Sequence, residues 1–140
     1  MFKRIRQYFA LSSCRKKILN EAMLFLFLAK MLLFVLPVKK VISISMVLRR
    51  KREVADLLLL KNLKWSLFHA NRISIWKNKC LVQSIAGKWM LQRRNMPLCL
   101  YFGASHDDSG KLIAHAWLDS NGFEIVEKGH DHVILKEICS

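Results

Sequence analysis

Several common motifs are missing from this sequence. Its four cysteines form no CxxC pair and show no close zinc-ligand spacing, which argues against a zinc finger. The phosphate-binding pattern GxxxxGK followed by Ser or Thr is also absent, so we assign no nucleotide site. No cleavable signal peptide is evident, since Lys30 interrupts the first apolar stretch and no small-residue cleavage site follows it. These absences favour a reducing, cytoplasmic setting with free thiols.

Acidic residues are scarce. The chain has 10 of them against 24 Lys and Arg, which gives a net charge of +14. Such an excess favours an acidic partner, whether nucleic acid, an anionic membrane surface or an acidic peptide. Most of the positive charge lies before Lys88, whereas residues 105–140 carry both signs, so the basic surface belongs to one half of the protein.

An uninterrupted membrane span is lacking too. Residues 21–36 (EAMLFLFLAKMLLFVL) are almost wholly apolar, but the run carries Lys30, ends at Pro37 and falls short of the ~20 residues that a span needs. We therefore expect a buried or interface helix here. At 140 residues, 53% of them apolar, the chain suits one modest folded domain.

The rest of the chain divides by its apolar periodicity. Residues 53–68 have helical spacing, while 38–46 fits either a helix or a short strand. From residue 98 the pattern becomes extended, with turn signals at 106–110 and at Asn121-Gly122. The expected strands are 98–105, 112–120, 123–128 and 132–138. The predicted fold class is α+β, in which a helical N-terminal region, 1–70, and a core region, 71–140, form one compact domain with a helix packed on a small antiparallel sheet.

The central helix of the core region is predicted to carry Cys80 in its first turn. Its apolar residues keep helical spacing with one wide buried face: Leu81, Val82, Ile85, Ala86, Trp89 and Met90. A thiol in the first turn lies among unpaired backbone N–H groups at the positive end of the helix dipole, which favours a nucleophilic thiolate. Asn78 can cap this helix, and Lys77 and Lys79 add positive charge. Taken alone, Cys80 would be interpreted as a small core residue.

A histidine on the second expected strand can complete a catalytic pair. His115 lies in AHAWL between two alanines, whose small side chains leave room for other groups around the strand. An imidazole presented by a strand can reach a thiolate at a helix start and hold it as an ion pair. Peptide cleavage also needs a third residue to orient the ring and N–H donors for the oxyanion. As donors we consider the Cys80 backbone and the Trp76 indole.

These residues carry a resemblance to a known family. CLVQSIAGKWMLQRRNMPLCLYFGAS followed by IAHAWLDSNG resembles the leader peptidase of lasso-peptide biosynthesis, the protease half of the lasso B protein, within the transglutaminase-like cysteine proteases. The resemblance covers roughly Trp76 to Gly122, and the apolar segment that ends at Pro37 also looks like the family's N-terminal region. The shared residues occur in the family's order: Cys80, Leu81, Arg93, Arg94, Pro97, Gly103, His115, Ala116 and Trp117.

The resemblance implies a transglutaminase- or papain-like core. It further implies a Cys-His-Asp triad that removes the leader peptide from a ribosomally made precursor through a thioester. Cys80 and His115 carry over directly. The family's aspartate falls twelve residues after the histidine, where this chain has Glu127, and a glutamate can accept the same hydrogen bond. Asp119 is the alternative third member, but on a regular strand it would lie about 13 Å from His115.

The resemblance also implies partners. A separate leader-recognition protein is expected, together with the precursor peptide and a macrolactam cyclase. Some family members link cleavage to ATP, which is the only ground for ATP here, and no cofactor or metal is assigned. The apolar N-terminal helices and the basic surface are candidates for contact with that partner or with anionic lipid. The protein is therefore expected in the cytoplasm, either free or peripheral at the inner face of the membrane.

A non-enzymatic interpretation competes with the peptidase. A small basic nucleic-acid-binding or membrane-surface protein without catalysis would account for the charge, with Trp65, Trp76 and Trp89 as stacking groups. These tryptophans fall on apolar helical faces, where core packing is the ordinary explanation, so nucleic acid is the less favoured partner.

Other chemistry from cysteine and histidine is weakly indicated. His130, His132, Cys139 and Cys80 have the residue types of a metal site, but their spacing does not support one. Cys14 and Cys99 are expected to be packing residues, and the sequence implies no partner for Cys99.

Overall fold

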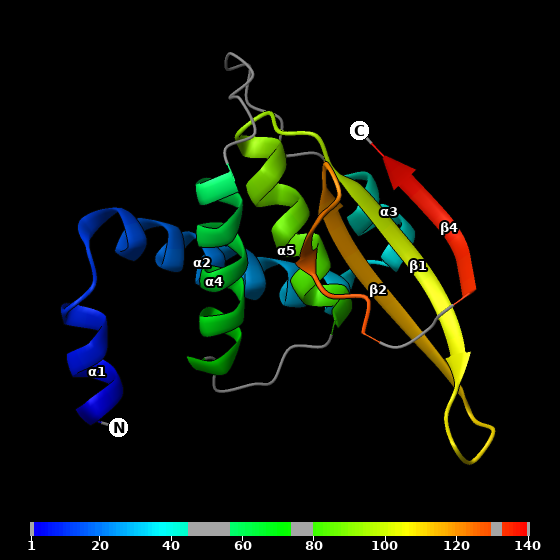
Figure 1. Cartoon of the computed structure of the whole chain (residues 1–140). Coiled ribbons are helices and arrows are strands. Elements are labelled where there is room, and N and C mark those ends of the chain that lie inside the picture. Colours follow the sequence, from blue (N-terminus) through cyan, green and yellow to red (C-terminus); the bar gives the residue numbers. More distant parts are fainter. Residues whose placement is uncertain (1, 45–56, 74–79, 130–132, 140) are drawn as a thin grey trace.

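Helices form the described part of the N-terminal half, and an antiparallel sheet forms the C-terminal part (Figure 1). The computed structural model describes residues 2–44, 57–73, 80–129 and 133–139. Within these residues the helices are α1 Phe2–Phe9, α2 Ser13–Val35, α3 Val38–Ser43, α4 Leu57–Ile73 and α5 Cys80–Arg93. The strands are β1 Cys99–His106, β2 Leu112–Ser120, β3 Phe123–Val126 and β4 Val133–Cys139. The predicted α+β class is confirmed.

The apolar run of the N-terminal half forms most of α2. The helix begins well before the predicted start, because the hydroxyl of Ser12 accepts a hydrogen bond from the backbone N–H of Arg15 and caps the first turn. It ends where predicted, with Leu36 in an extended conformation just before Pro37. The ambiguous segment that follows is helical, since residues 38–43 form α3.

Helices α4 and α5 lie between two layers, helix α2 on one side and the sheet on the other, and the hydrophobic core fills the space between these layers. In Figure 1, α2 runs behind these two helices, and the sheet covers α5 from the other side. Helix α5 is buried almost all round, and its Trp89 is fully enclosed, with the ring of Phe25 from α2 packed edge-on at 6.0 Å. One hydrophobic cluster takes in residues of α2, α4, α5 and the strands. The predicted boundary near residue 70 falls inside α4.

An ion-pair cluster ties the end of α5 to α2. Both guanidinium N–H groups of Arg94 donate to the two carboxylate oxygens of Glu21, at 2.8 and 2.7 Å, and Arg93 lies 3.4 Å from the same carboxylate. The Arg94 side chain also donates to the backbone carbonyl of Met90. A bidentate pair of this kind fixes geometry as well as charge. Arg93 and Arg94 thus have a structural contact with α2, far from Cys80 at the other end of α5.

Two side chains of α5 hold the end of α3. The ammonium of Lys88 donates to the carbonyls of Ile42 and Ile44, and the indole N–H of Trp89 donates to that of Ile44 at 3.2 Å. These contacts satisfy carbonyls that a helix end leaves without partners. Burial lowers the pKa of Lys88 below 10.5, because removal from water disfavours the charged ammonium.

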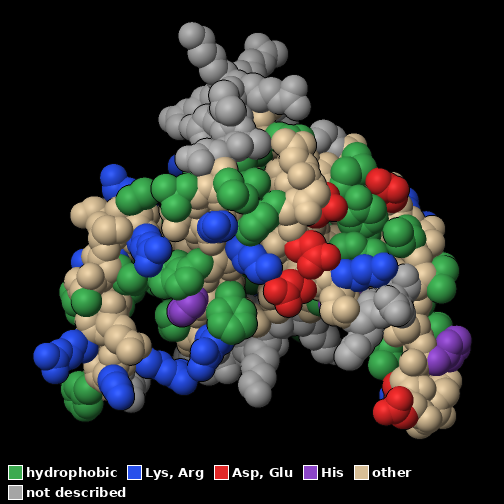
Figure 2. All heavy atoms as spheres, viewed as in Figure 1, with side chains coloured by type: hydrophobic (Ala, Val, Ile, Leu, Met, Phe, Trp, Pro, Cys, Tyr) green, Lys and Arg blue, Asp and Glu red, His purple; other side chains and the backbone are tan. Residues whose placement is uncertain are grey.

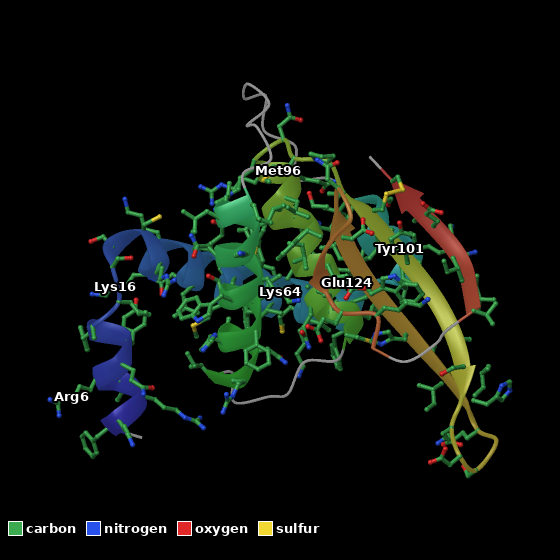
Figure 3. The ribbon with its side chains drawn as sticks, in the orientation of Figure 1. Arg6, Lys16, Lys64, Met96, Tyr101 and Glu124 are labelled. Atoms are coloured by element: carbon green, nitrogen blue, oxygen red, sulfur yellow. A yellow bond between two sulfur atoms is a disulfide. The ribbon has the colours of Figure 1, made fainter. Side chains whose placement is uncertain are left out.

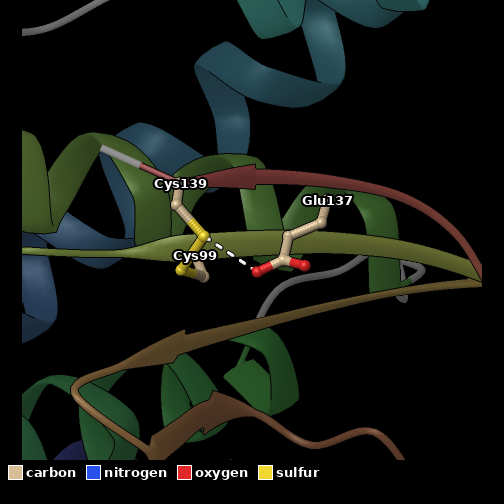
Figure 4. A group of neighbouring side chains, drawn as sticks. All are labelled: Cys99, Glu137 and Cys139. Carbon is tan, nitrogen blue, oxygen red and sulfur yellow. Dashed lines mark hydrogen bonds between the residues drawn. A yellow bond between two sulfur atoms is a disulfide. The ribbon is translucent and has the colours of Figure 1, made fainter.

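The sheet has the strand order β3-β2-β1-β4, with antiparallel neighbours throughout. The predicted Asn121-Gly122 turn joins β2 to β3, and both residues have positive φ, at 51° and 80°. At the opposite edge, Cys99 of β1 faces Cys139 of β4, and the two sulfurs form a disulfide (Figure 4). Two expectations are therefore wrong, namely that Cys99 has no partner and that Cys99 and Cys139 are free thiols, because strand register brings together two residues 40 positions apart.

Candidate active site

A cavity of about 470 Å³ opens where α4, the start of α5 and the β2-β3 edge of the sheet meet. Three residues singled out from the sequence, Cys80, His115 and Glu127, all line it. Its other walls come from α4, α5 and β3: Lys61, Lys64, Trp65, Leu67, Phe68, Gln83, Phe123, Ile125 and Val126. The cavity therefore combines a thiol and an imidazole with a largely apolar wall, which is the usual composition of a ligand site.

Cys80 is the first residue of α5, which agrees with its predicted place in the first turn. It is half-buried, so its sulfur can be reached from the cavity while its backbone belongs to the core helix. The N–H groups of the first helical turn have no intrahelical acceptor, so they can donate to an anionic group of a ligand at this position. The predicted cap Asn78, the lysines at 77 and 79 and the donor Trp76 lie outside the described residues.

His115 is held by the main chain next to β3. Its Nε2 lies 3.0 Å from the backbone carbonyl oxygen of Glu127. A carbonyl can only accept, so Nε2 carries the hydrogen of this contact, and proton transfer by the ring would involve Nδ1. The ring also stacks on Trp117, with centroids 5.9 Å apart and planes 22° apart.

Trp117 in turn depends on Gly103 of β1. A Cβ atom at position 103 would lie 2.7 Å from the Trp117 ring, too close for any side chain. Glycine therefore lets the indole lie flat across β1, where it also stacks on Tyr101 at 5.5 Å. Gly103 and Trp117, two of the residues that carry the family resemblance, thus support the strand position of His115.

Glu127 contacts the histidine through a different atom from the one predicted. The sequence comparison expected its carboxylate to orient the ring, and the structure gives that contact to the backbone carbonyl. The carboxylate itself is 68% exposed and forms an ion pair with Lys64 of α4 at 3.0 Å. Figure 3 shows Lys64 on α4 beside the β3 hairpin, consistent with its ammonium lying 5.7 Å from the Phe123 ring centroid. Figure 2 shows blue and red side chains side by side where α4 meets this hairpin.

The alternative third residue, Asp119, lies elsewhere. It pairs with Cys99 across β1 and β2 and lines a separate cavity with Tyr101 and Cys139. Burial raises the pKa of Asp119 despite an opposing hydrogen bond from Tyr101. The structure therefore groups Glu127, and not Asp119, with Cys80 and His115.

Several cavity residues were not found from the sequence. Gln83 follows Cys80 by three positions, so the two share a face of α5, and this spacing could have signalled it. On α4, Lys61, Lys64, Trp65 and Phe68 likewise follow helical spacing. Their spacing was visible, but only the packing of α4 against β3 shows that this face borders the site.

Trp65 separates the candidate site from a second cavity of about 340 Å³. The second cavity lies between α1, α2 and α4, with Arg4, Tyr8, His69 and Arg72 among its lining residues. The guanidinium of Arg15 lies 5.1 Å from the Trp65 ring centroid. The tryptophan that sequence analysis assigned to core packing is thus a half-buried wall between two cavities, whereas Trp89 is a core residue.

The described residues offer one cluster with metal-ligand types, namely Cys99, Glu137 and Cys139. Its two sulfurs are bonded to each other, which removes the thiolates that a metal would need (Figure 4). Of the earlier candidate ligands, Cys80 lies in the active-site cavity and Cys139 at the sheet edge, while His130 and His132 lie outside the described residues. The structure does not bring Cys80 and Cys139 to one site.

The comparison with known families agrees with this architecture. A family model described as the transglutaminase-like superfamily matches residues 23–136, a range that contains Cys80, His115 and Glu127. No curated protein and no solved structure matches the chain significantly.

Proposed function

We propose that this protein, which belongs to the transglutaminase-like superfamily, is a cysteine peptidase that removes the leader peptide from a lasso-peptide precursor. The observation that carries the proposal is that Cys80, at the start of the buried helix α5, and His115, on β2, line one cavity. The superfamily includes cysteine peptidases. The more specific substrate rests on the ordered set of residues from Cys80 to Trp117 that resembles the lasso leader peptidases.

In the first step, Nδ1 of His115 takes the proton of the Cys80 thiol, and the resulting ion pair makes the sulfur nucleophilic. The thiolate attacks the carbonyl carbon of the scissile peptide bond and forms a C–S bond. The backbone N–H of Cys80, with Trp76 as the proposed second donor, stabilises the oxyanion that develops on the carbonyl oxygen. The N-terminus of α5 is suited to this task, because its first N–H groups have no helical acceptor.

In the second step, the oxyanion collapses and the C–N bond breaks. The imidazolium of His115 gives its proton to the leaving amine, and a thioester remains on Cys80. Water then loses a proton to Nδ1 and attacks the thioester carbonyl. The C–S bond breaks, the leader leaves with its new carboxylate, and the imidazolium returns its proton to the sulfur, which restores the thiol. No cofactor takes part in these steps, and ATP is assigned no role in them.

The third member acts by orienting the ring. The Glu127 carbonyl accepts the Nε2 hydrogen and thereby favours the tautomer in which Nδ1 acts as the base. The pair between Lys64 and the Glu127 carboxylate ties the chain after β3 to α4. Lys64 is thus a positioning residue, which acts on the catalytic histidine through Glu127.

The test is a cleavage assay with the precursor peptide and a separate leader-recognition protein, the partner that this proposal requires. Cleavage is expected with the native chain, and Cys80→Ala and His115→Ala should each abolish it while circular dichroism shows an unchanged fold. Cys14→Ala is the matched control, because Cys14 is an exposed thiol outside the cavity. Full cleavage by Cys80→Ala would show that Cys80 is not the nucleophile and would contradict the proposed mechanism.

A further inference from the structure

Helix α2 has two apolar faces, of which only one is used by the core. The inner face packs against α4 and α5 through Ile18, Leu19, Ala22, Phe25, Leu26 and Ala29. The opposite side of its C-terminal half is exposed and consists of large apolar residues: Met23, Leu24, Phe27, Met31, Phe34 and Val35. We call these six residues the outer face of α2. Phe34, the most exposed, has 90% of its surface accessible. Apolar patches of this kind mark sites of association.

The packing of the inner face against α4 and α5 opposes a membrane-spanning position of α2. The expectation that this segment is too short for a span is wrong for the whole helix, because α2 extends back to Ser13 and by its length of 23 residues and its hydropathy could cross a membrane. Crossing, however, would pull Leu19 and Leu26 out of the core, where each is about 1% exposed. It would also break the bidentate pair between Glu21, whose side chain is 10% exposed, and Arg94. Removing one partner of such a pair leaves the other charge buried without a counter-ion, which is strongly destabilising. A helix anchored on one side can meet lipid only along its other side.

The charge around the outer face points to an anionic surface. Lys30 lines a shallow apolar hollow on it together with Phe27, Met31 and Phe34. Lys39 and Lys40 lie exposed on α3, directly after the outer face, and Lys17 is exposed near the other end of α2. Before Ile44, the only acidic residue of the sequence is Glu21, whose carboxylate already binds Arg93 and Arg94.

Helix α1 repeats the same combination. Its exposed apolar residues Phe2, Ile5 and Phe9 alternate with Lys3, Arg4 and Arg6. The hydroxyl of Tyr8 donates to the Asn20 side chain at 3.0 Å and so holds the end of α1 against α2. Figure 2 shows green and blue side chains together along α1, at the left of the view. Basic amphipathic helices of this type lie in the plane of a membrane surface.

We propose that the outer face of α2 rests on an anionic lipid bilayer, with its apolar side chains at the boundary of headgroups and acyl chains. Lys30, Lys39 and Lys40 then lie at the level of the lipid phosphates, and α1 adds a second basic, apolar contact. Nucleic acid fits this surface poorly, because its backbone would meet Leu24, Phe27 and Met31 at the centre. This inference stands apart from the proposed peptidase activity.

The test is co-sedimentation of the full chain with vesicles of phosphatidylcholine alone or mixed with phosphatidylglycerol. We expect binding to the mixed vesicles that weakens with added salt, and little binding to phosphatidylcholine. Phe34→Glu should weaken the partition coefficient about tenfold to a hundredfold, the equivalent of one buried aromatic side chain. Lys39→Gln combined with Lys40→Gln should reduce the preference for the anionic vesicles.

Leu135→Glu is the matched control, because Leu135 is apolar and 71% exposed but lies on the edge strand β4. It should bind the mixed vesicles like the native chain, and so should Cys80→Ala, which separates this inference from the peptidase. Absence of native binding, or equal losses from Phe34→Glu and Leu135→Glu, would overturn it. Self-association that Phe34→Glu abolishes, without vesicle binding, would overturn it as well and identify a second copy as the occupant.

Discussion

The Nε2 atom of His115 lies 3.0 Å from the backbone carbonyl oxygen of Glu127, while the carboxylate of the same residue pairs with Lys64. One residue thus links the candidate catalytic histidine of β2 to helix α4. The main chain orients the ring, and the side chain holds the main chain in place. The Glu127 side chain should therefore matter less for catalysis than a carboxylate that binds the histidine directly.

Glu127→Gln should therefore lower kcat/KM by no more than about fivefold, since an exposed ion pair is worth roughly 1 kcal/mol or less. Lys64→Met should have the same effect, and the double variant should cost little more than either single one, because all three break one contact. Asp119→Asn should leave activity unchanged. The measurement is steady-state cleavage of the precursor by the four variants.

A loss above a hundredfold in Glu127→Gln, with Lys64→Met near native, would show that the carboxylate itself acts on the histidine. A larger loss in Asp119→Asn than in Glu127→Gln would reassign the third member to Asp119.

Thiol reactivity offers a test that needs no substrate. Cys99 and Cys139 are bonded to each other, so without reductant iodoacetamide can reach only Cys14 and Cys80. Cys14 is the more exposed of the two, yet Cys80 should be alkylated first at neutral pH, because the proposed mechanism has His115 activate its sulfur. Mass spectrometry of the digested protein gives the rate at each site. In His115→Ala, alkylation of Cys80 should slow while that of Cys14 does not change. Faster labelling of Cys14 in the native protein would contradict an activated Cys80.

The Glu21 carboxylate should be a large contributor to stability. Glu21→Gln leaves Arg94, whose side chain is 16% exposed, without its bidentate partner. We expect the free energy of unfolding to fall by about 2–4 kcal/mol, as for other buried charges that lose a partner. Urea unfolding measures it. Glu124→Gln, at an exposed glutamate on β3, should change stability by less than about 0.5 kcal/mol. Equal effects of the two substitutions would mean that the pair with Arg94 does not stabilise the fold.

Lys88 should make stability depend on pH in the alkaline range. Its pKa is lowered in the folded protein, so between that value and 10.5 the unfolded chain binds more protons than the folded one. Stability from this group is therefore least when Lys88 is protonated in both states, and it rises as pH increases toward 10.5. Urea unfolding of the native chain and of Lys88→Met, repeated along this range, measures both free energies of unfolding. The free energy of the native chain should rise relative to that of Lys88→Met as pH increases. A difference that does not change with pH would contradict this account of Lys88.

The sequence by itself determined the local features of this protein. Helical spacing placed Cys80 in the first turn of α5, alternation placed His115 on β2, and Asn121-Gly122 marked the turn between β2 and β3. These features depend on neighbours within a few residues, and such neighbours are visible in a sequence.

Only the tertiary structure decided the contacts between distant segments. The disulfide between Cys99 and Cys139 depends on the register of β1 and β4, and the pair between Glu21 and Arg94 joins residues 73 positions apart. Which atom of Glu127 contacts His115 depends on the path of the chain after β3 and on the ion pair between the Glu127 carboxylate and Lys64. Periodicity reports which side of an element is buried, but it carries no information on which other element covers that side. That choice follows from the packing of the layers.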